Sequence, residues 1–303
     1  MENLGEPIGP PPRFRVGVVG TGRAGSVLGA ALHRAGHRVV AAYAVSDLSR
    51  LRAEAMLPDT PLLPLADVVD SADLVLLTIP DDVLADVVAG LVGTGHIRPG
   101  QLVVHASGRH GIGVLARATE AGALPLALHP VMTLTGTSVD LDRLSGCPFG
   151  VTAPAPLRPI AEALVVEMGG EPVWVDEEDR ALYHAALAHG SNHLVALVSQ
   201  SLELLDAAGV EDSARLIGPL LGATLDNALR LRDQALTGPV VRGDAETVAA
   251  HIRSIERISD ETARTYVELA RATADRALAT GELRSDAAER LLDVLARSLR
   301  EQR

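Results

Sequence analysis

The feature that most constrains the fold is a glycine-rich turn near the N-terminus. An apolar run over residues 14–19 is followed at once by Gly20-Thr21-Gly22-Arg23-Ala24-Gly25 and then by an Ala- and Leu-rich segment. A second apolar run over 38–43 completes a strand–helix–strand unit. In such a unit the first glycine allows a tight turn, the second lets the backbone approach a pyrophosphate, and the third lets helix and strand pack closely. Residues 20–25 therefore predict a dinucleotide-binding turn at the start of a helix.

The pattern of the chain changes near residue 175. Before it, helical patterns alternate with aliphatic strands, expected at 14–19, 38–43, 73–79, 101–105, 124–129, 149–153 and 171–175. This alternation indicates a mostly parallel, doubly wound sheet covered on both faces. After it only helical patterns remain, at 177–208, 210–236, 244–279 and 285–301. We expect a disordered tail over 1–12, an α/β Rossmann domain over 13–175 and an all-α domain over 176–303.

Charge and composition narrow the possible partners and mechanisms. The net charge of −12 argues against binding to nucleic acid or to an anionic membrane. All 27 basic residues are Arg, which excludes a catalytic lysine. The single cysteine, Cys147, allows neither a disulfide framework nor a Cys-rich zinc site. The polar N-terminus has no apolar signal core, so we expect a soluble, cytoplasmic protein.

Residues 20–43, GTGRAGSVLGAALHRAGHRVVAAY, resemble the start of the 6-phosphogluconate dehydrogenase-like reductases, which include ketopantoate and pyrroline-5-carboxylate reductases. In that group the second strand ends in an acidic residue for NAD, or in Asn-Arg or Ser-Arg for NADP. Tyr43 and Ala44 occupy those positions here, so no carboxylate is placed to bind an adenosine ribose. The residues that follow can hold a 2′-phosphate: Ser46, Ser49 and Arg50. The resemblance thus implies NADP in preference to NAD, although Asp47 opposes a phosphate and the two serines can also be helix caps.

Three segments follow predicted strands, where ligands bind in an open α/β sheet. Ile79 and Pro80 match the loop that passes beside the nicotinamide in the group resembled. Ser107, in "HASG", can contact the carboxamide or the substrate, or can simply belong to a turn. His129, in "LALHP", is either a site residue or a histidine bonded to the backbone.

Four further motifs, "HASG", "LHPVMTLTG", "YHAALAHGSNHLVAL" and "TGPVVRGD", make the resemblance more specific. Together with the glycine turn they resemble a subgroup of Rossmann-like proteins whose helical C-terminal domain has no known function. The resemblance spans roughly residues 14–260. It implies a reductase-like, NADP-binding protein.

Polar residues interrupt an otherwise apolar helical segment, 181–205, that we expect to be buried. Related hydroxyacid dehydrogenases carry a Lys on this helix and an Asn four residues later, but here Ala188 stands four residues before Asn192. Helical spacing places His184, Ser191 and Asn192 along one face, which we expect to line the cofactor cleft. Hydrogen bonding within the fold is the alternative. HGSNH lacks the glutamate of a zinc-protease motif, so no metal is expected.

Arg242, in the loop "TGPVVRGD", can clamp a substrate carboxylate or form a surface pair with Asp244. We therefore expect an NADP-dependent oxidoreductase that reduces a small ketopantoate-like 2-oxo acid or a cyclic imine. His184 or His129 would supply the proton, Asn192 and Ser107 would orient the substrate, and Arg242 would hold its carboxylate. The alternative is a non-catalytic NADP-binding sensor or scaffold. The very apolar helices after residue 176 also predict a homodimer.

Overall fold

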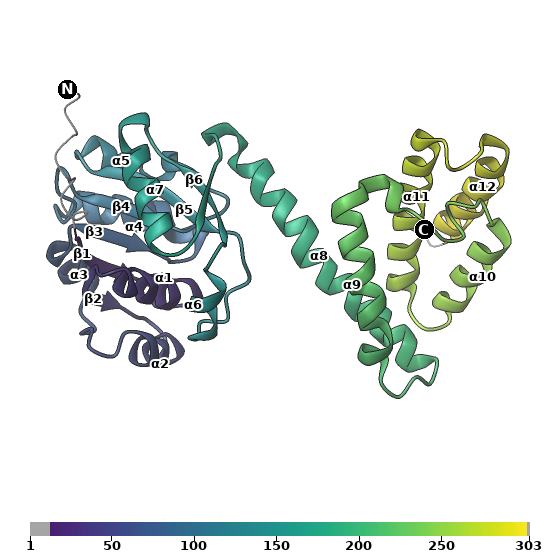
Figure 1. Cartoon of the computed structure of the whole chain (residues 1–303), viewed down its shortest axis with the longest axis horizontal. Coiled ribbons are helices and arrows are strands. Elements are labelled where there is room, and N and C mark those ends of the chain that lie inside the picture. The colour runs from purple at the N-terminus through teal and green to yellow at the C-terminus, as the bar shows by residue number, and fades with distance from the viewer. Residues whose placement is uncertain (1–12, 302–303) are drawn as a thin grey trace, which may run out of the picture. The chain divides into compact units, whose positions relative to one another are not determined.

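A computed structural model describes residues 13–301. The chain divides into two compact units, Met1–Gly190 and Ser191–Arg303 (Figure 1). The division lies beyond the expected boundary at 175, because the segment that follows the last strand bonds to the first unit. The tail expected over 1–12 lies outside the described residues. No helix within 13–301 has both the length and the apolarity needed to cross a membrane.

The first unit is built on a seven-stranded sheet of order β2-β1-β3-β4-β5-β6-β7. Its strands are β1 Arg15–Val19, β2 Arg38–Tyr43, β3 Leu74–Leu77, β4 Leu102–His105, β5 Leu124–Pro130, β6 Pro148–Thr152 and β7 Glu171–Trp174. Neighbouring strands are parallel except β5 and β6, which are antiparallel. The mostly parallel sheet and the helical region after it confirm the predicted fold class.

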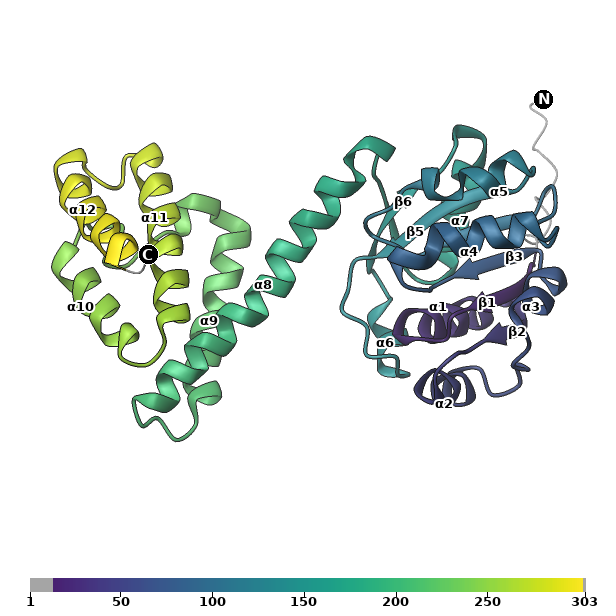
Figure 2. The same ribbon diagram turned by 180° about the vertical axis from the view of Figure 1, so that it is seen from behind.

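Helices cover both faces of the sheet (Figures 1 and 2). One face packs against α1 Arg23–Arg34, α6 Val139–Arg143 and α7 Arg158–Glu167. The other packs against α3 Leu65–Ser71, α4 Asp81–Gly93 and α5 Ala116–Glu120. Successive residues of β3 alternate between the two cores, with Leu74 and Leu76 in one and Val75 and Leu77 in the other. Strands buried on both faces are continuously apolar, which explains why the sequence reveals them.

The lone cysteine lies in the first of these cores. Cys147 is buried just before β6, and its thiol is 3.4 Å from the carbonyl oxygen of Pro148. Burial raises the pKa of the Cys147 thiol. The residue is therefore a packing element, as expected for a cysteine with no disulfide partner in the chain.

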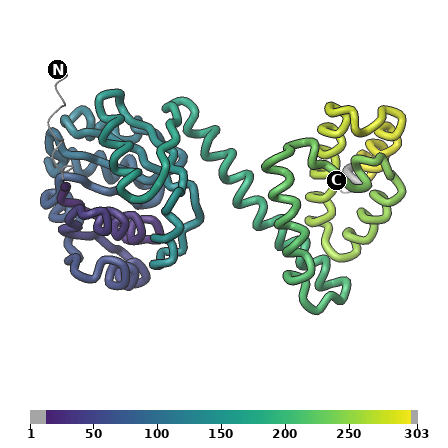
Figure 3. The backbone as a smooth tube through the Cα atoms, in the orientation of Figure 1, coloured from purple at the N-terminus to yellow at the C-terminus, as the bar shows by residue number. Residues whose placement is uncertain are grey.

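The second unit contains α9 Ser213–Leu231, α10 Ala245–Glu256, α11 Asp260–Thr280, α12 Ser285–Glu301 and the later part of α8 Arg180–Ala207 (Figure 3). Its core lies among α10, α11 and α12. The single helix predicted over 244–279 is wrong, because the chain breaks between α10 and α11. The Ser259 hydroxyl accepts a hydrogen bond from the Thr262 backbone N–H and starts a new helix there.

The prediction that the segment 181–205 is buried is also wrong for a single copy of the chain. Within α8 only Arg180 is buried, and α9 has no buried residue. Large apolar side chains of α9 are exposed, including Leu220 at 65% and Leu229 at 76%. These helices have apolar surfaces that their own chain leaves uncovered.

The glycine turn yields a test of packing with a matched control. A Cβ on Gly25 would collide with the Gly20 carbonyl oxygen and the Thr78 hydroxyl, whereas a Cβ on Gly22 would meet nothing within 4 Å. Gly25→Ala should therefore lower the free energy of unfolding by about 1–3 kcal/mol, the usual cost of overpacking. Gly22→Ala should lower it by less than about 1 kcal/mol. Urea denaturation followed by circular dichroism measures both, and equal losses would contradict the close contact.

Candidate functional site

The start of α1 is an open helix N-terminus at the carboxyl edge of the sheet. Gly20 has a φ of 96°, which favours glycine, and its backbone turns the chain from β1 toward α1. Gly22, the residue before the helix, borders open space, and the first turn has no acidic residue. The unpaired N–H groups and the helix dipole attract an anion at this point. Arg23, Ala24 and Gly25 form that first turn, so the turn has the form that a pyrophosphate requires.

The segment after β2 lies against this turn. The buried Thr21 hydroxyl donates to the Ser49 carbonyl oxygen at 2.8 Å, which ties the turn to α2 Asp47–Met56. Ser46 and Ser49 form the reciprocal capping box of α2, and such capping is compatible with contact to a phosphate. Arg50 is exposed and makes no ion pair within residues 13–301.

Sequence reasoning missed a second arginine in this region. Gly136 lies between Arg52 and the backbone of Arg23, because a Cβ on it would be 2.8 Å from Arg52 Nε and 3.1 Å from Arg23 Cα. The buried Asp140 carboxylate holds this loop by accepting hydrogen bonds from the Thr135 and Gly136 N–H groups at 2.7 and 2.8 Å. Arg52 follows Ser49 by three residues on the same helix face, and that spacing was the available signal.

A cluster of ring side chains lies at the carboxyl end of β5. His129 Nδ1 is 2.8 Å from the Tyr183 hydroxyl, and the His129 and His184 rings are perpendicular with centroids 6.2 Å apart. Both histidines reach Gly108, where a Cβ would lie 2.8 Å from His129 Nε2 and 2.7 Å from His184 Cδ2. The structure therefore brings together two of the predicted residues, His129 and His184, beside the "HASG" loop.

Tyr183 reaches His129 through the space above a glycine. Gly150 in β6 pairs with His129 across the antiparallel ladder, and a Cβ on Gly150 would collide with the Tyr183 hydroxyl. Tyr183 is one of the polar candidates of the segment 181–205, but helical spacing did not place it on the face with His184, and Gly150 was not assigned to the site. The available signal was a glycine inside a strand pattern, which marks a close approach.

His105 and Ser107 shape the loop after β4. His105 is fully buried, its Nε2 is 2.8 Å from the Gly111 carbonyl oxygen, and its Nδ1 accepts from the Ser107 N–H at 3.2 Å. The Ser107 hydroxyl accepts from the His110 N–H at 3.2 Å, so it supports the turn. Desolvation lowers the pKa of His105 to about 4, which keeps its ring neutral near neutral pH.

A buried arginine lies under the cluster. Arg180 is 1% exposed and donates to the Thr152 hydroxyl at 2.7 Å and to the carbonyl oxygens of Gly150 and Ala127 at 3.0 and 3.3 Å. No carboxylate pairs with it, and its Nη1 has no partner in the described structure. Desolvation, followed by the charge of Arg180, lowers the pKa of His129 to about 4. Burial raises the pKa of the Tyr183 hydroxyl, and the charge of Arg180 opposes that rise.

The remaining predicted residues lie in other places. Ile79 approaches Gly20, and Pro80 precedes α4. Ser191, Asn192 and Arg242 are exposed residues of the second unit. Asp244 caps α10 by accepting from the Thr247 N–H at 3.1 Å, and the alternative Arg242–Asp244 pair is not among the ion pairs of residues 13–301.

Two family models match the chain. Residues 6–130 match a Rossmann-like domain, and residues 147–273 match DUF2520, a domain of unknown function. The chain carries both domains. This confirms the resemblance inferred from the motifs. The DUF2520 match begins at Cys147, so it includes β6, β7 and the Tyr183–His184 pair. No curated protein sequence matches the chain.

Solved structures share this fold at low sequence identity. A candidate NADP oxidoreductase from Bacteroides fragilis has 22% identity and a TM-score of 0.74, covering 87% of this chain and 98% of its own. An imine reductase from Myxococcus stipitatus in complex with NADP+ has 18% identity and a TM-score of 0.66, covering 94% and 99%. A pyrroline carboxylate reductase from Plasmodium falciparum with NADP bound has 11% identity and a TM-score of 0.52, covering 86% and 98%.

The two low histidine pKa values predict how stability depends on pH. His105 and His129 have pKa values of about 4 in the folded chain, below the ordinary value of 6.5. As pH falls from 6.5 to 4 the unfolded chain binds protons that the folded chain does not. The free energy of unfolding should therefore fall across this window, by about 3 kcal/mol for each histidine.

Urea denaturation at several pH values between 7.5 and 4 measures this loss. His105→Gln should reduce the dependence on pH, and His33→Gln, at an exposed position, should leave it unchanged. An unchanged dependence in His105→Gln would contradict the neutral, buried ring.

Proposed function

We propose that the protein is an NADPH-dependent oxidoreductase that reduces a small oxo acid or a cyclic imine. The observation that carries this proposal is the His129–Tyr183 pair, which lies at the carboxyl edge of the same sheet as the glycine turn. Ligands of open α/β sheets bind outside this edge, at the point where the strand order reverses. Here β1 lies between β2 and β3, so the reversal falls beside the glycine turn. The structurally similar proteins include NADP oxidoreductases and an imine reductase, which supports the same class of reaction.

The residues at this edge fit the parts of NADPH. The N–H groups of residues 23–25 would bind the pyrophosphate, and Ile79, Pro80 and Ser107 would border the nicotinamide. Ser46, Ser49 and Arg50 would lie near the 2′-phosphate, and β2 ends in Tyr43 with no carboxylate to repel it. When bound, NADPH supplies the hydride.

The His129–Tyr183 pair can supply the proton. In the tautomer in which the neutral His129 ring accepts from the Tyr183 hydroxyl at Nδ1, the ring proton is on Nε2, the atom that approaches Gly108. Transfer of that proton to the substrate nitrogen or oxygen allows Tyr183 to return one to Nδ1. Arg180 then stabilises the phenolate, because its guanidinium carbon lies 5.6 Å from the centre of the Tyr183 ring. His184, against the same loop, is the alternative donor, and the roles predicted for Ser191, Asn192 and Arg242 stay predictions.

We also propose that the protein is a homodimer formed through α8 and α9. Leu220 and Leu229 point about 180° apart around α9, given 100° for each residue of a helix. A helix that is apolar on opposite sides must be buried, and its own chain does not bury it. A second copy of the chain has the matching apolar surface.

The proton path predicts how the reaction rate responds to substitution. His129→Asn should lower turnover by roughly 10²–10⁴, the range for loss of a general acid, and Tyr183→Phe should lower it by about tenfold or more. The binding of NADPH, followed by fluorescence, should be unchanged in both. NADPH oxidation measured with a panel of 2-oxo acids and cyclic imines tests this, with His33→Gln as the control. Tight NADPH binding with no turnover by the unsubstituted chain would support a sensor or scaffold instead.

The cofactor preference predicts a difference between two arginines. Arg50→Ala should weaken NADPH binding by about 1.5–3 kcal/mol, the size of a charge-assisted hydrogen bond, and leave NADH nearly unchanged. Arg38→Ala, at the opposite end of β2, should affect neither cofactor. Fluorescence titration measures the four affinities, and equal losses for both cofactors in Arg50→Ala would contradict the assignment.

If the protein is a homodimer formed through α8 and α9, its mass in solution should depend on the apolar side chains of α9. The unsubstituted chain should have twice the monomer mass in light scattering at micromolar concentration. Leu220→Arg should give a monomer, because it buries an unpaired charge at the interface. Leu48→Arg, at an exposed leucine of α2, should stay a dimer. A monomeric unsubstituted chain would contradict the proposal.

A further inference from the structure

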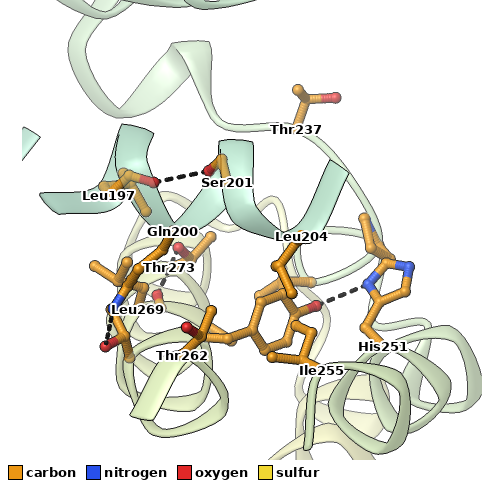
Figure 4. A pocket seen from close by; sticks show the side chains of 15 residues that line it. Leu197, Gln200, Ser201, Leu204, Thr237, His251, Ile255, Thr262, Leu269 and Thr273 are labelled. Carbon is orange, nitrogen blue, oxygen red and sulfur yellow. Dashed lines mark hydrogen bonds between the residues drawn. The ribbon is translucent and has the colours of Figure 1, made fainter. Parts of the chain in front are cut away.

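The second unit contains a cavity of about 360 Å³ that none of the residues assigned above lines (Figure 4). This volume falls within the range of small-molecule sites in proteins, about 300–1,000 Å³. Its walls come from the later part of α8, from α10 and α11, and from residues 237–240 of the "TGPVVRGD" loop. The cavity therefore belongs to one compact unit and is defined by that unit alone.

The lining has no ionic group. The residues around the cavity include no Asp, Glu, Lys or Arg, and Arg242 is not among them. The apolar part of the wall includes Leu204, Ile255 and Leu269. A carboxylate or an ammonium ion that entered would lose its hydration without gaining a counter-ion. The lining thus selects an uncharged occupant with an apolar body.

Polar groups occupy the two ends of the cavity. His251 Nδ1 is 2.9 Å from the Tyr266 hydroxyl, and the two rings are nearly perpendicular. If the hydroxyl donates, His251 keeps an Nε2–H, and if Nδ1 donates, Tyr266 keeps its O–H. In either tautomer one hydrogen-bond donor of the pair stays available. Figure 4 shows His251 at one end of the cavity and Gln200 and Thr273 at the other.

The opposite end offers acceptors beside the Gln200 amide, whose Nε2 donates to the Thr265 hydroxyl at 3.3 Å. The Thr273 hydroxyl donates to the Leu269 carbonyl oxygen at 2.8 Å, and the Ser201 hydroxyl donates to that of Leu197 at 2.8 Å. Because these hydrogens are committed to the helices, the hydroxyl oxygens offer lone pairs to the cavity. A donor at one end and acceptors at the other match a molecule that carries both a carbonyl oxygen and an N–H group.

We propose that this cavity binds a small, uncharged organic molecule with an apolar ring or chain and an amide-type group. The carbonyl oxygen of the ligand accepts from the His251–Tyr266 pair, and its apolar body packs against Leu204, Ile255 and Leu269. The proposal rests on the second unit and does not depend on the proposed reductase activity.

Three probes that share one ring and differ in charge test this proposal: benzamide, benzoate and benzylamine. Isothermal titration calorimetry with the full-length chain at pH 7.5 should show saturable binding of benzamide. Benzoate and protonated benzylamine should bind at least about tenfold more weakly. Tyr266→Phe should weaken benzamide binding about three- to tenfold, the effect of one hydrogen bond.

A pair of tryptophan substitutions on α11 locates the site. Leu269 lines the cavity and is 45% exposed, so Leu269→Trp should block benzamide while the chain stays folded. Ala272→Trp adds the same bulk at an exposed position outside the lining and should leave binding unchanged. Thermal melts of both variants confirm that they are folded, and Thr273→Trp replaces Leu269→Trp if the latter is not.

Binding of benzoate as tight as that of benzamide would overturn the proposal, as would normal binding in the blocked variant. The absence of saturable benzamide binding by the unsubstituted chain would also overturn it, whether or not a second copy covers the cavity. NADPH titration of the same samples keeps the two proposals separate. If the unsubstituted chain binds benzamide but does not bind NADPH, the result would count against the proposed reductase activity and leave the cavity proposal standing.

Discussion

The candidate site depends on the hydrogen bonds that the buried guanidinium of Arg180 donates. The guanidinium bonds to β5, to β6 and to the Thr152 hydroxyl, which in turn donates to the Val175 carbonyl oxygen after β7. The start of α8 is thereby joined to the one antiparallel pair of the sheet. Tyr183 follows one helical turn later and reaches His129 because Gly150 leaves room for it. A buried charge without a counter-ion costs several kcal/mol, so its retention is consistent with an electrostatic role beside the ring cluster.

Local signals determined which parts of this molecule could be predicted from the sequence. The glycine turn and the seven strands depend on residues close together in the chain, and they lie where the sequence indicates. Arg180 looks like any polar residue at a helix start, and its burial depends on strands far away in sequence. The break at Ser259 was hidden because helical periodicity continues on both sides of the cap. The apolar composition of α8 indicates burial but does not say which chain provides the cover.

The described part of each unit contains a His–Tyr pair of the same kind, in different surroundings. His129 with Tyr183 and His251 with Tyr266 each join Nδ1 to a phenol hydroxyl, at 2.8 and 2.9 Å. The first pair lies over a buried cation, which can stabilise a phenolate and so allow a proton to leave. The second faces a cavity whose lining has no ion, so it suits hydrogen bonding without proton transfer. The surroundings of each pair, more than the pair itself, decide what it can do.

The burial of Cys147 has a practical consequence for spectroscopy. Its thiol lies in a packed core with a raised pKa, which makes it a poor target for thiol-directed reagents. A cysteine introduced at any exposed position would therefore be the preferred point of attachment for a fluorophore or a spin label. Labels placed in pairs, one in each unit, could report the distance between the units in solution without removal of the native cysteine. The absence of lysine extends this selectivity, since amine-directed reagents find no side-chain target in the chain.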